Sequence, residues 1–533
     1  MKIRVSRSIL IALAVALLGA RPASSQIQSV KLAQGELQGV VKDGVASFKG
    51  IPFAAPPVGD LRWKAPQPPK PWTGVRKAEA FAPGPMQDTG MAALMGAPTN
   101  VSEDCLYLNV WTAAKSAEDK LPVMVWIYGG AFLAGTTSAA VYDGTKLAQK
   151  GVALVSIAYR VGPFGFLAHP DLGKESGKGS GCYGIQDQVA GLRWVKDNIA
   201  HFGGDPSRVT IFGESAGGIS VSMLTVVPAA KGLFQRAISQ SGASMAPVKR
   251  DGEAGQNVPS LELAEKTGKD FLAKLGANDI KAARALTAEQ IQNAAGRTML
   301  FWPAADGETL PGDQYELFEA GRFNDTPVLA GTNSDEGALF VRTGGTPAAF
   351  EERVRASFGP AAEGILKAYP HATDAETFKS SKDIFRESAF AWHTWAWATL
   401  QSRKGKDPAF VYYFDHRTPN SPDGSNHAAE IPYVFRNLGG RGGALRPEDI
   451  ALSDLMSSYW INFAKSGDPN GPGLPAWPAF DEKEMKAMFF DKTPGARPIP
   501  NLEKLKAFDA YYAWRREEAK AKAGKTPSKT SAE

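Results

Sequence analysis

Short apolar runs alternate with amphipathic stretches along most of the chain, and this alternation predicts the fold class. Apolar residues recur at helical spacing in 186–202, whose other face is polar and charged. Strands that alternate with amphipathic helices predict an α/β protein with a largely parallel sheet. Five runs rich in β-branched and aromatic residues are typical of buried strands: 123–128, 153–159, 209–212, 327–330 and 410–414.

Three other segments depart from this pattern. Short glycine-punctuated runs in 35–49 predict an antiparallel meander. Prolines crowd 52–71, which predicts an ordered loop or sheet edge, since proline cannot donate to a central ladder. The polar, helix-forming stretch 253–295 predicts a peripheral helical cap.

The two ends of the chain are expected to lie outside the fold. Residues 1–25 combine basic residues, ten apolar residues and a small-residue cleavage site, which is typical of a secretory signal peptide. Ten apolar residues are too few to span a bilayer, so we expect export to the periplasm or medium without a stable membrane anchor. The Lys-, Ser- and Thr-rich segment 516–533 is expected to be a disordered basic tail. Residues 26–515 then form one domain.

The net charge and the cysteine count give further information about what the protein binds and how it is cross-linked. Removing the four basic residues of 1–25 reduces the formal net charge of +5 to +1, which gives no electrostatic case for binding nucleic acid. Cys105 and Cys182 are the two cysteines. In an oxidising compartment such a pair suggests one disulfide, and two buried free thiols are the alternative.

The sequence Gly-Glu-Ser-Ala-Gly at 213–217 is the most informative motif. It directly follows the predicted strand 209–212 and precedes an apolar stretch that suits a helix. Strand, tight turn and helix form the context of a nucleophile elbow, in which glycines relieve crowding around an exposed serine hydroxyl. We therefore predict Ser215 as a nucleophile.

A nucleophilic serine needs backbone donors for the oxyanion. Gly130 and Ala131 follow the predicted strand 123–128 and carry little bulk, so a substrate can approach their backbone. These two residues and Ala216, directly after the serine, are the predicted donors.

The serine also needs a base and an acid that orients the base. Of six histidines, His416 and His427 have the order and spacing expected of the base, and the small-residue loop around His427 favours it without excluding His416. The acidic pair at 335–336 follows the strand 327–330 and suits the acid, with Asp306 as a rival.

The chain resembles the type-B carboxylesterase and cholinesterase family across nearly all of residues 26–515. The matching stretches are FKGIPFA at 48–54, GDLRW at 59–63, SEDCLYLNV at 102–110, YRVG at 159–162, FGGDP at 202–206, the serine motif, SQSG at 239–242 and FAKSGDPN at 463–470. The resemblance implies an α/β-hydrolase fold, with a large, mixed, mostly parallel central sheet, helices on both faces and a helical cap region.

The resemblance also assigns roles to residues. The family's acid falls on Glu336 and its histidine on His427, while Glu214 and Glu430 are expected around the imidazole. Arg62 is expected to pair with Glu103. The implied activity is hydrolysis of carboxylic esters through an acyl-enzyme, with no metal or organic cofactor and a small-molecule ester as partner.

An amidase or carbamate hydrolase with the same residues is one alternative. Another is a non-catalytic adhesion protein of the family, which retention of all three catalytic residues argues against.

Two departures from the family pattern matter. The usual disulfide partner of Cys105 is absent near 85–87, which leaves Cys182 as its expected partner. The stretch 88–103 contains no aromatic residue that could hold a quaternary ammonium by cation–π attraction. Choline esters are therefore not the expected substrates.

Overall fold

The computed structural model describes residues 26–523, except 95, 97–98, 252, 254–256, 297–298 and 442–444. The predicted signal peptide at 1–25 lies outside the described residues, as does the end of the predicted tail, 524–533. Within the described part of the chain, no helix is both long enough and apolar enough to cross a membrane.

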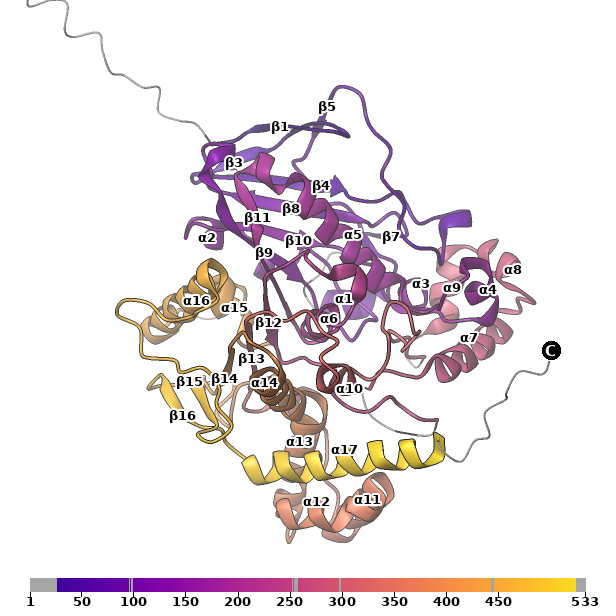
Figure 1. Ribbon diagram of the computed structural model, residues 1–533, viewed down its shortest axis with the longest axis vertical. Helices are drawn as coiled ribbons and strands as arrows, with labels where there is room; N and C mark the ends of the chain where they lie inside the picture. Colours follow the sequence, from indigo (N-terminus) through magenta and orange to yellow (C-terminus); the bar gives the residue numbers. More distant parts are fainter. Residues whose placement is uncertain are drawn as a thin grey trace, which may run out of the picture.

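An 11-stranded mixed sheet forms the centre of the molecule (Figure 1). From one edge to the other its strands are β16 (Gly495–Pro498), β15 (Lys486–Phe490), β14 (Ala409–Phe414), β13 (Val328–Asn333), β12 (Arg236–Gln240), β11 (Gly204–Glu214), β9 (Leu121–Ile127), β10 (Ala153–Ile157), β8 (Tyr107–Thr112), β4 (Val45–Pro52) and β3 (Val40–Lys42). Neighbouring strands pair in parallel from β15 through β14, β13, β12, β11 and β9 to β10. Antiparallel pairs form both edges.

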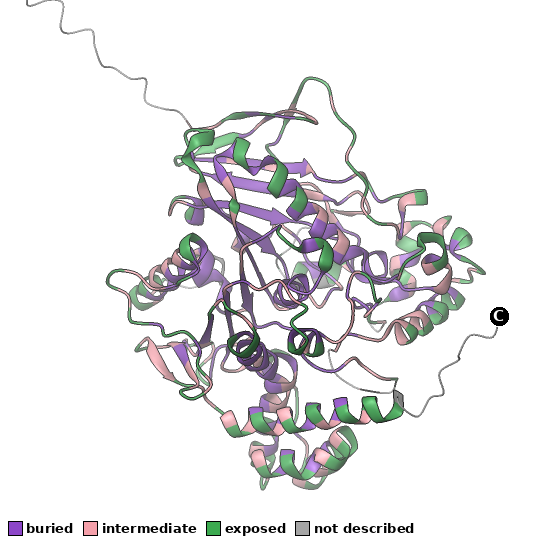
Figure 2. Ribbon diagram, viewed as in Figure 1, coloured by how far each residue is buried: buried purple, intermediate pink, exposed green. Residues whose placement is uncertain are grey.

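The five predicted strands all occur in the parallel part of this sheet. Their near-continuous apolar sequences reflect burial on both faces, and β10 and β13 are buried at every position. Figure 2 shows the sheet as the buried centre, with exposed residues on the outer sides of the helices. The predicted antiparallel meander at 35–49 is present only in part: β3 and β4 pair antiparallel, whereas β2 (Gly35–Gln38) pairs with β1 (Ser29–Leu32) in a separate three-stranded sheet.

Helices cover both faces of the sheet, as alternate side chains of β14 demonstrate. Tyr412 packs its ring on Trp460 of α16 (Pro447–Ser466). The next residue, Tyr413, has its phenol near Arg386 and Glu387, in the segment directly before α14 (Trp392–Lys404). Because successive side chains of a strand point to opposite faces, α16 and α14 lie on opposite sides.

The remaining helices follow the order that the alternating pattern predicts. They are α1 (Thr89–Leu94), α2 (Thr145–Ala148), α3 (Gly162–Phe166), α4 (Pro170–Ser176), α5 (Tyr183–Asn198), α6 (Ala216–Leu224), α7 (Leu261–Leu275), α8 (Ile280–Arg284), α9 (Ala288–Ala295), α10 (Gln314–Glu319), α11 (Pro347–Phe358), α12 (Ala362–Ala368), α13 (Asp374–Arg386), α15 (Ile431–Phe435) and α17 (Leu502–Ala523). The smaller strands are β5 (Val75–Lys77), β6 (Gly84–Pro85) and β7 (Val101–Ser102).

Helices α7 to α9 form the predicted peripheral cap at one end of the molecule (Figure 1). Arg62 ties this cap to the amino-terminal loops. Its guanidinium forms two hydrogen bonds with Glu103, at 2.7 and 2.6 Å, as expected, and also donates to the carbonyl of Leu286 at 2.8 Å.

The predicted boundary of the basic tail at 516 is wrong. Helix α17 continues to Ala523, and Arg516 is buried, with its Nε 3.2 Å from Oδ2 of Asp313 and its guanidinium 4.0 Å from the centre of the Tyr315 ring. Aromatic and arginine side chains make most of the buried face of α17, and arginine stems pack on apolar surface. The lysine-rich composition of the segment therefore gave no sign that the helix packs against the domain.

The expected disulfide between Cys105 and Cys182 is also absent. Both residues are buried free thiols, and they occupy different environments. The Cys182 thiol donates to the carbonyl of Ala304 at 3.1 Å, whereas Cys105 lies near the charged pair of Arg160 and Asp187. Burial raises the pKa of both thiols, so each remains protonated.

Candidate active site

Ser215 occupies the turn between β11 and α6 at the carboxyl end of the parallel strands. Its backbone has φ 56° and ψ −126°, a conformation that a serine adopts only under steric strain. The Ser215 N–H donates to the carbonyl of Gln240 at the end of β12, at 2.9 Å, and its carbonyl accepts from Ile219 N in α6 at 2.8 Å. These bonds hold the strained turn in place.

The glycines of the motif are required by close packing. A Cβ on Gly217 would lie 2.0 Å from the carbonyl oxygen of Ile127 in β9, and one on Gly213 would lie 2.6 Å from the same atom. Any side chain at either position would therefore push β11 and α6 away from β9.

The predicted donors come from two segments. Gly130 and Ala131 have φ of 120° and 56° in the loop after β9, and their N–H groups make no hydrogen bond within the described part of the chain. Ala216 is the first residue of α6, where N–H groups lack an intrahelical partner. A Cβ on the neighbouring Gly129 would lie 3.0 Å from Cβ of Ser215, so the loop and the elbow are adjacent.

Glu336 and His427 form a short polar contact in the site. Glu336 begins the turn after β13 and is fully buried. Its Oε2 lies 2.6 Å from Nδ1 of His427. Its other oxygen, Oε1, accepts from Ser241 Oγ at 2.6 Å and from the backbone N–H of Asn333 at 2.7 Å. With all these contacts the carboxylate is fixed relative to the imidazole.

The other imidazole nitrogen faces Glu214, the residue before the serine. His427 Nε2 lies 3.1 Å from Oε1 of Glu214, and the described residues include no hydrogen bond between Nε2 and Ser215 Oγ. The structure thus brings Ser215, Glu336 and His427 to one place, with the imidazole turned towards the carboxylate beside the serine.

Three buried carboxyl groups surround the imidazole. Burial raises the pKa of Glu214 to about 8, although the nearby His427 lowers it. Burial also raises the pKa of Glu430, which accepts hydrogen bonds from Gln240 at 2.9 Å and from Asn333 at 2.6 Å. For His427, burial lowers the pKa, but Glu214 and Glu336 outweigh it and raise the value to about 9.

The rival residues lie elsewhere. His416 contacts Asp449 at 2.7 Å, away from the serine, and its carbonyl accepts from Ser425 Oγ. Asp335 pairs with Lys382 at 2.9 Å. Asp306 accepts from the backbone of a tight turn, including Leu310 N at 2.8 Å. Neither the imidazole of His416 nor the carboxylates of Asp335 and Asp306 contact His427.

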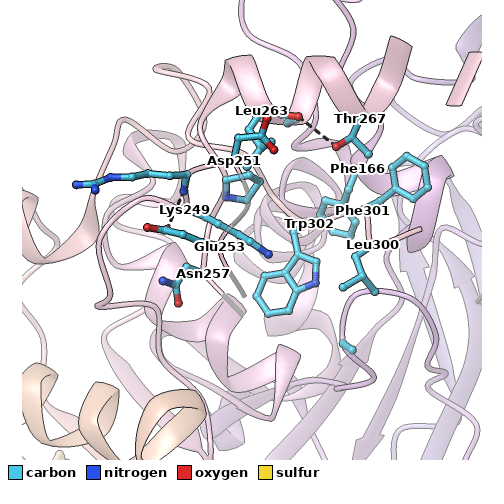
Figure 3. A pocket seen from close by; sticks show the side chains of 14 residues that line it. Phe166, Lys249, Asp251, Glu253, Asn257, Leu263, Thr267, Leu300, Phe301 and Trp302 are labelled. Atoms are coloured by element: carbon cyan, nitrogen blue, oxygen red, sulfur yellow. Dashed lines mark hydrogen bonds between the residues drawn. The ribbon is translucent and has the colours of Figure 1, made fainter. Parts of the chain in front are cut away.

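A pocket of about 290 Å³ opens beside the donor loop (Figure 3). Ala131 lines it, and the ring of the next residue, Phe132, packs edge-on against Phe166 and Trp302 of its wall, at 5.2 and 5.1 Å. Figure 3 shows Phe166, Leu300, Phe301 and Trp302 on one side, with Lys249 and Glu253 opposite. The pocket can therefore hold an apolar or aromatic group whose far end is polar.

Over the described residues, no group of three or more His, Cys, Asp and Glu side chains is arranged to hold a metal ion.

Comparison with known proteins decides the family. The profile of the carboxylesterase family matches residues 26–508. The chain belongs to the carboxylesterase family. It is therefore an esterase with an α/β-hydrolase fold.

Relatives and solved structures span most of the chain. The para-nitrobenzyl esterase of Bacillus subtilis is 37% identical over 90% of this chain and 97% of its own length. The fumonisin B1 esterase of Sphingopyxis macrogoltabida is 36% identical over 87% of each. A solved para-nitrobenzyl esterase superposes with a TM-score of 0.77 at 37% identity, covering 90% of this chain and 99% of the other. A Geobacillus stearothermophilus carboxylesterase gives a TM-score of 0.78 at 36% identity, with the same coverage.

Sequence reasoning missed several residues that hold the site. Ser241 and Gln240 belong to a family-like motif, but nothing in their spacing indicated contacts with Glu336 and Glu430. Asn333 is the last residue of β13, where a polar residue ending a buried strand was an available signal. Phe390 and Phe340, which pack on His427, carried no signal because aromatic residues are common in any core.

Proposed function

We propose that the protein hydrolyses carboxylic esters through an acyl-enzyme on Ser215. Ser215 Oγ attacks the ester carbonyl carbon and its proton passes to His427 Nε2, while Glu336 holds Nδ1. The N–H groups of Gly130, Ala131 and Ala216 stabilise the oxyanion. His427 then gives the proton to the departing alcohol oxygen as the C–O bond breaks. Water, deprotonated by His427, attacks the acyl carbon, and His427 returns this proton to Ser215 Oγ as the acyl–Oγ bond breaks and the acid leaves.

One observation carries this proposal: Glu336 Oε2 lies 2.6 Å from His427 Nδ1, beside a serine held at φ 56°. A carboxylate at Nδ1 fixes the tautomer with a free Nε2, which is the base that a serine requires. The imidazole of the resting site faces Glu214, the neighbour of Ser215. Catalytic hydrogen bonds are often long before substrate binds, and rotation about the Ser215 Cα–Cβ bond changes the position of Oγ.

The pocket beside Ala131 supports a substrate class. Its aromatic wall of Phe166 and Trp302 suits an aryl or other bulky apolar group, and the polar side fits a polar substituent on that group. Two relatives carry the names para-nitrobenzyl esterase and cocaine esterase, the latter human and 35% identical over 83% of each chain. We propose that this chain also prefers esters with an aromatic group on one side.

A substrate panel and a covalent label test the proposal together. The purified protein should hydrolyse p-nitrophenyl and benzyl esters, and a fluorophosphonate should label Ser215 alone. The amide and carbamate analogues of the same compounds should turn over far more slowly. Labelling of a different serine, or no turnover of any ester, would overturn the assignment and favour the non-catalytic alternative.

We also propose export to the periplasm or medium, supported by the pattern of residues 1–25. Expression of the full chain in a bacterial host, followed by fractionation and amino-terminal sequencing, tests it. A mature chain beginning near Gln26 is expected outside the cytoplasm, and an uncleaved cytoplasmic protein would contradict the proposal.

A further inference from the structure

Two phenylalanine rings enclose the imidazole of His427. Phe390 stacks on it nearly face to face, with 4.6 Å between ring centres and 18° between planes. Phe340 meets it edge-on, at 5.4 Å and 66°. Phe390 is 1% exposed, whereas Phe340 is 45% exposed, so Phe390 is the fixed, inner contact.

An irregular turn presents Phe390. Residues Glu387–Ala391 form a π-helical turn between α13 and α14. A π-helical turn inserts an extra residue into a helix and therefore changes which side chain faces a neighbour; such turns are rare and frequent at functional sites. Phe390 is one of its five residues, and this turn directs its ring onto His427.

Buried charges fasten this turn to the segment that carries Glu336. Arg386, directly before the turn, donates to Glu387 Oε1 from Nε at 3.0 Å. Its Nη1 donates to the carbonyl of Ser334, two residues before Glu336, at 2.7 Å. Arg386 and Glu387 are both buried. The turn that holds Phe390 and the loop that holds Glu336 are therefore one connected support, and each contacts a different part of the imidazole.

The hydrogen bond to Glu336 does not by itself fix the plane of the ring. The torsion that turns an imidazole about its Cβ–Cγ bond has a broad energy profile. Moreover, Glu214 lies 3.1 Å from Nε2 and competes with Ser215 for that nitrogen. A flat aromatic face against the imidazole restricts this rotation, whereas an aliphatic side chain of similar volume leaves it free.

We infer that Phe390 is a positioning residue, which sets the plane of the His427 imidazole so that Nε2 stays within reach of Ser215. The inference rests on the proposed function, since it gives His427 the role of base. It assigns to Phe390 an effect on kcat and none on substrate affinity.

The test compares Phe390→Leu and Phe390→Met, which keep apolar volume without a flat face, with Phe390→Tyr, which keeps the ring. Steady-state kinetics with p-nitrophenyl acetate should show kcat lower by about 10- to 100-fold in the Leu and Met variants. KM should stay within about twofold. The Tyr variant should retain most of the activity.

Phe350→Leu is the matched control. Phe350 is buried and stacks on His371, at 5.5 Å and 25°, in a part of the fold away from Ser215. Thermal unfolding should report a similar loss of stability in Phe350→Leu and Phe390→Leu, while only the latter loses kcat. Fluorophosphonate labelling of wild-type Ser215 tests the proposed function separately, so its failure is distinguishable.

Three results would overturn the inference. A raised KM with kcat unchanged would mean that Phe390 contacts substrate. Wild-type kcat in both Phe390→Leu and Phe390→Met would mean that the ring face has no role. An equal loss of kcat in Phe390→Tyr, at unchanged thermal stability, would mean that the aromatic plane is not what matters.

Discussion

His427 Nδ1 lies 2.6 Å from Oε2 of Glu336, and Nε2 of the same ring lies 3.1 Å from Oε1 of Glu214. The imidazole is thus held between two buried carboxylates, of which only one can act as its orienting partner. Glu336 is better placed to orient the imidazole, because hydrogen bonds from Ser241 Oγ and the N–H of Asn333 to its other oxygen fix the carboxylate. Burial raises the pKa of Glu214 to about 8, although the nearby His427 lowers it.

Replacement of Ser215 tests the nucleophile. Ser215→Ala should lower kcat by on the order of 10⁵- to 10⁶-fold, as loss of the nucleophile does in serine hydrolases, and leave the thermal unfolding midpoint within a few degrees. The substitution removes only the attacking oxygen. Turnover of p-nitrophenyl acetate and circular dichroism together measure both effects, and an active Ser215→Ala variant would refute the mechanism.

The two acidic neighbours have different expected roles. Glu336→Gln should lower kcat by about 10⁴-fold, since the amide no longer favours the correct tautomer or the imidazolium. Asp335→Asn should cost less than about tenfold, because Asp335 contacts Lys382 and not the imidazole. The same assay on both variants decides, and the reverse order would assign the acid to Asp335.

The two histidines can be separated in the same way. His427→Ala should be as inactive as Ser215→Ala. His416→Ala should keep most of its kcat, because His416 pairs with Asp449 away from the serine. Its thermal stability should fall, since a hydrogen bond of a buried side chain is lost. An inactive but fully folded His416→Ala variant would count against the placement of the base.

The pH dependence follows from the carboxylates around His427. Burial lowers the pKa of His427, but Glu214 and Glu336 raise it further, so the net shift is upward. The base acts when neutral, and a raised pKa makes the neutral form scarce until the pH is higher. We therefore expect kcat/KM to rise with pH and to reach half its maximum above about 6.5. Glu214→Gln removes one negative charge, so this midpoint should move to lower pH; an unchanged or higher midpoint would contradict it.

Five strands of the parallel part and the β3–β4 pair were predictable, but β8, β12, β15 and β16 were not. Strands such as β9 and β10 are buried on both faces and leave a continuous apolar run in the sequence. Strand β12 lies between β11 and β13, yet its sequence RAISQ mixes polar and apolar residues and was not recognised. Its polar residues Ser239 and Gln240 are buried because they hold the nearby glycine turn and Glu430. Such tertiary contacts leave no periodic signal.

The site was predictable to a different extent. Ser215 followed from local context, because strand, turn and helix are contiguous in the sequence. His427 and Glu336 come from distant loops, and residue patterns left His416, Asp335 and Asp306 open until family resemblance chose between them. The support by Phe390 depends on a π-helical turn, and no residue type is specific to that geometry.

The cysteines provide a test independent of catalysis. Thiol titration of the unfolded, unreduced protein should find two free thiols per chain, because Cys105 and Cys182 are both unpaired. In the native protein the same reagent should react slowly, since burial raises the pKa of both thiols and keeps them protonated. Detection of no free thiol after denaturation would restore the disulfide.

The carboxyl-terminal helix should be part of the folded domain as far as Arg516. A chain ended after Ala523 should keep the unfolding midpoint of the full protein, whereas one ended after Arg515 should unfold at a clearly lower temperature. The second truncation leaves Asp313 buried without the guanidinium that lies 3.2 Å away, and loss of one partner of a buried ion pair costs about 3–5 kcal/mol.

Arg516→Met separates the effect of the charge from the effect of helix length, because it keeps the helix and most of the apolar stem. Its midpoint should fall close to that of the shorter truncation, and Asp313→Asn in the same chain should recover part of the loss, because the buried negative charge is then gone. Equal midpoints for the two truncations would return the start of the tail to residue 516.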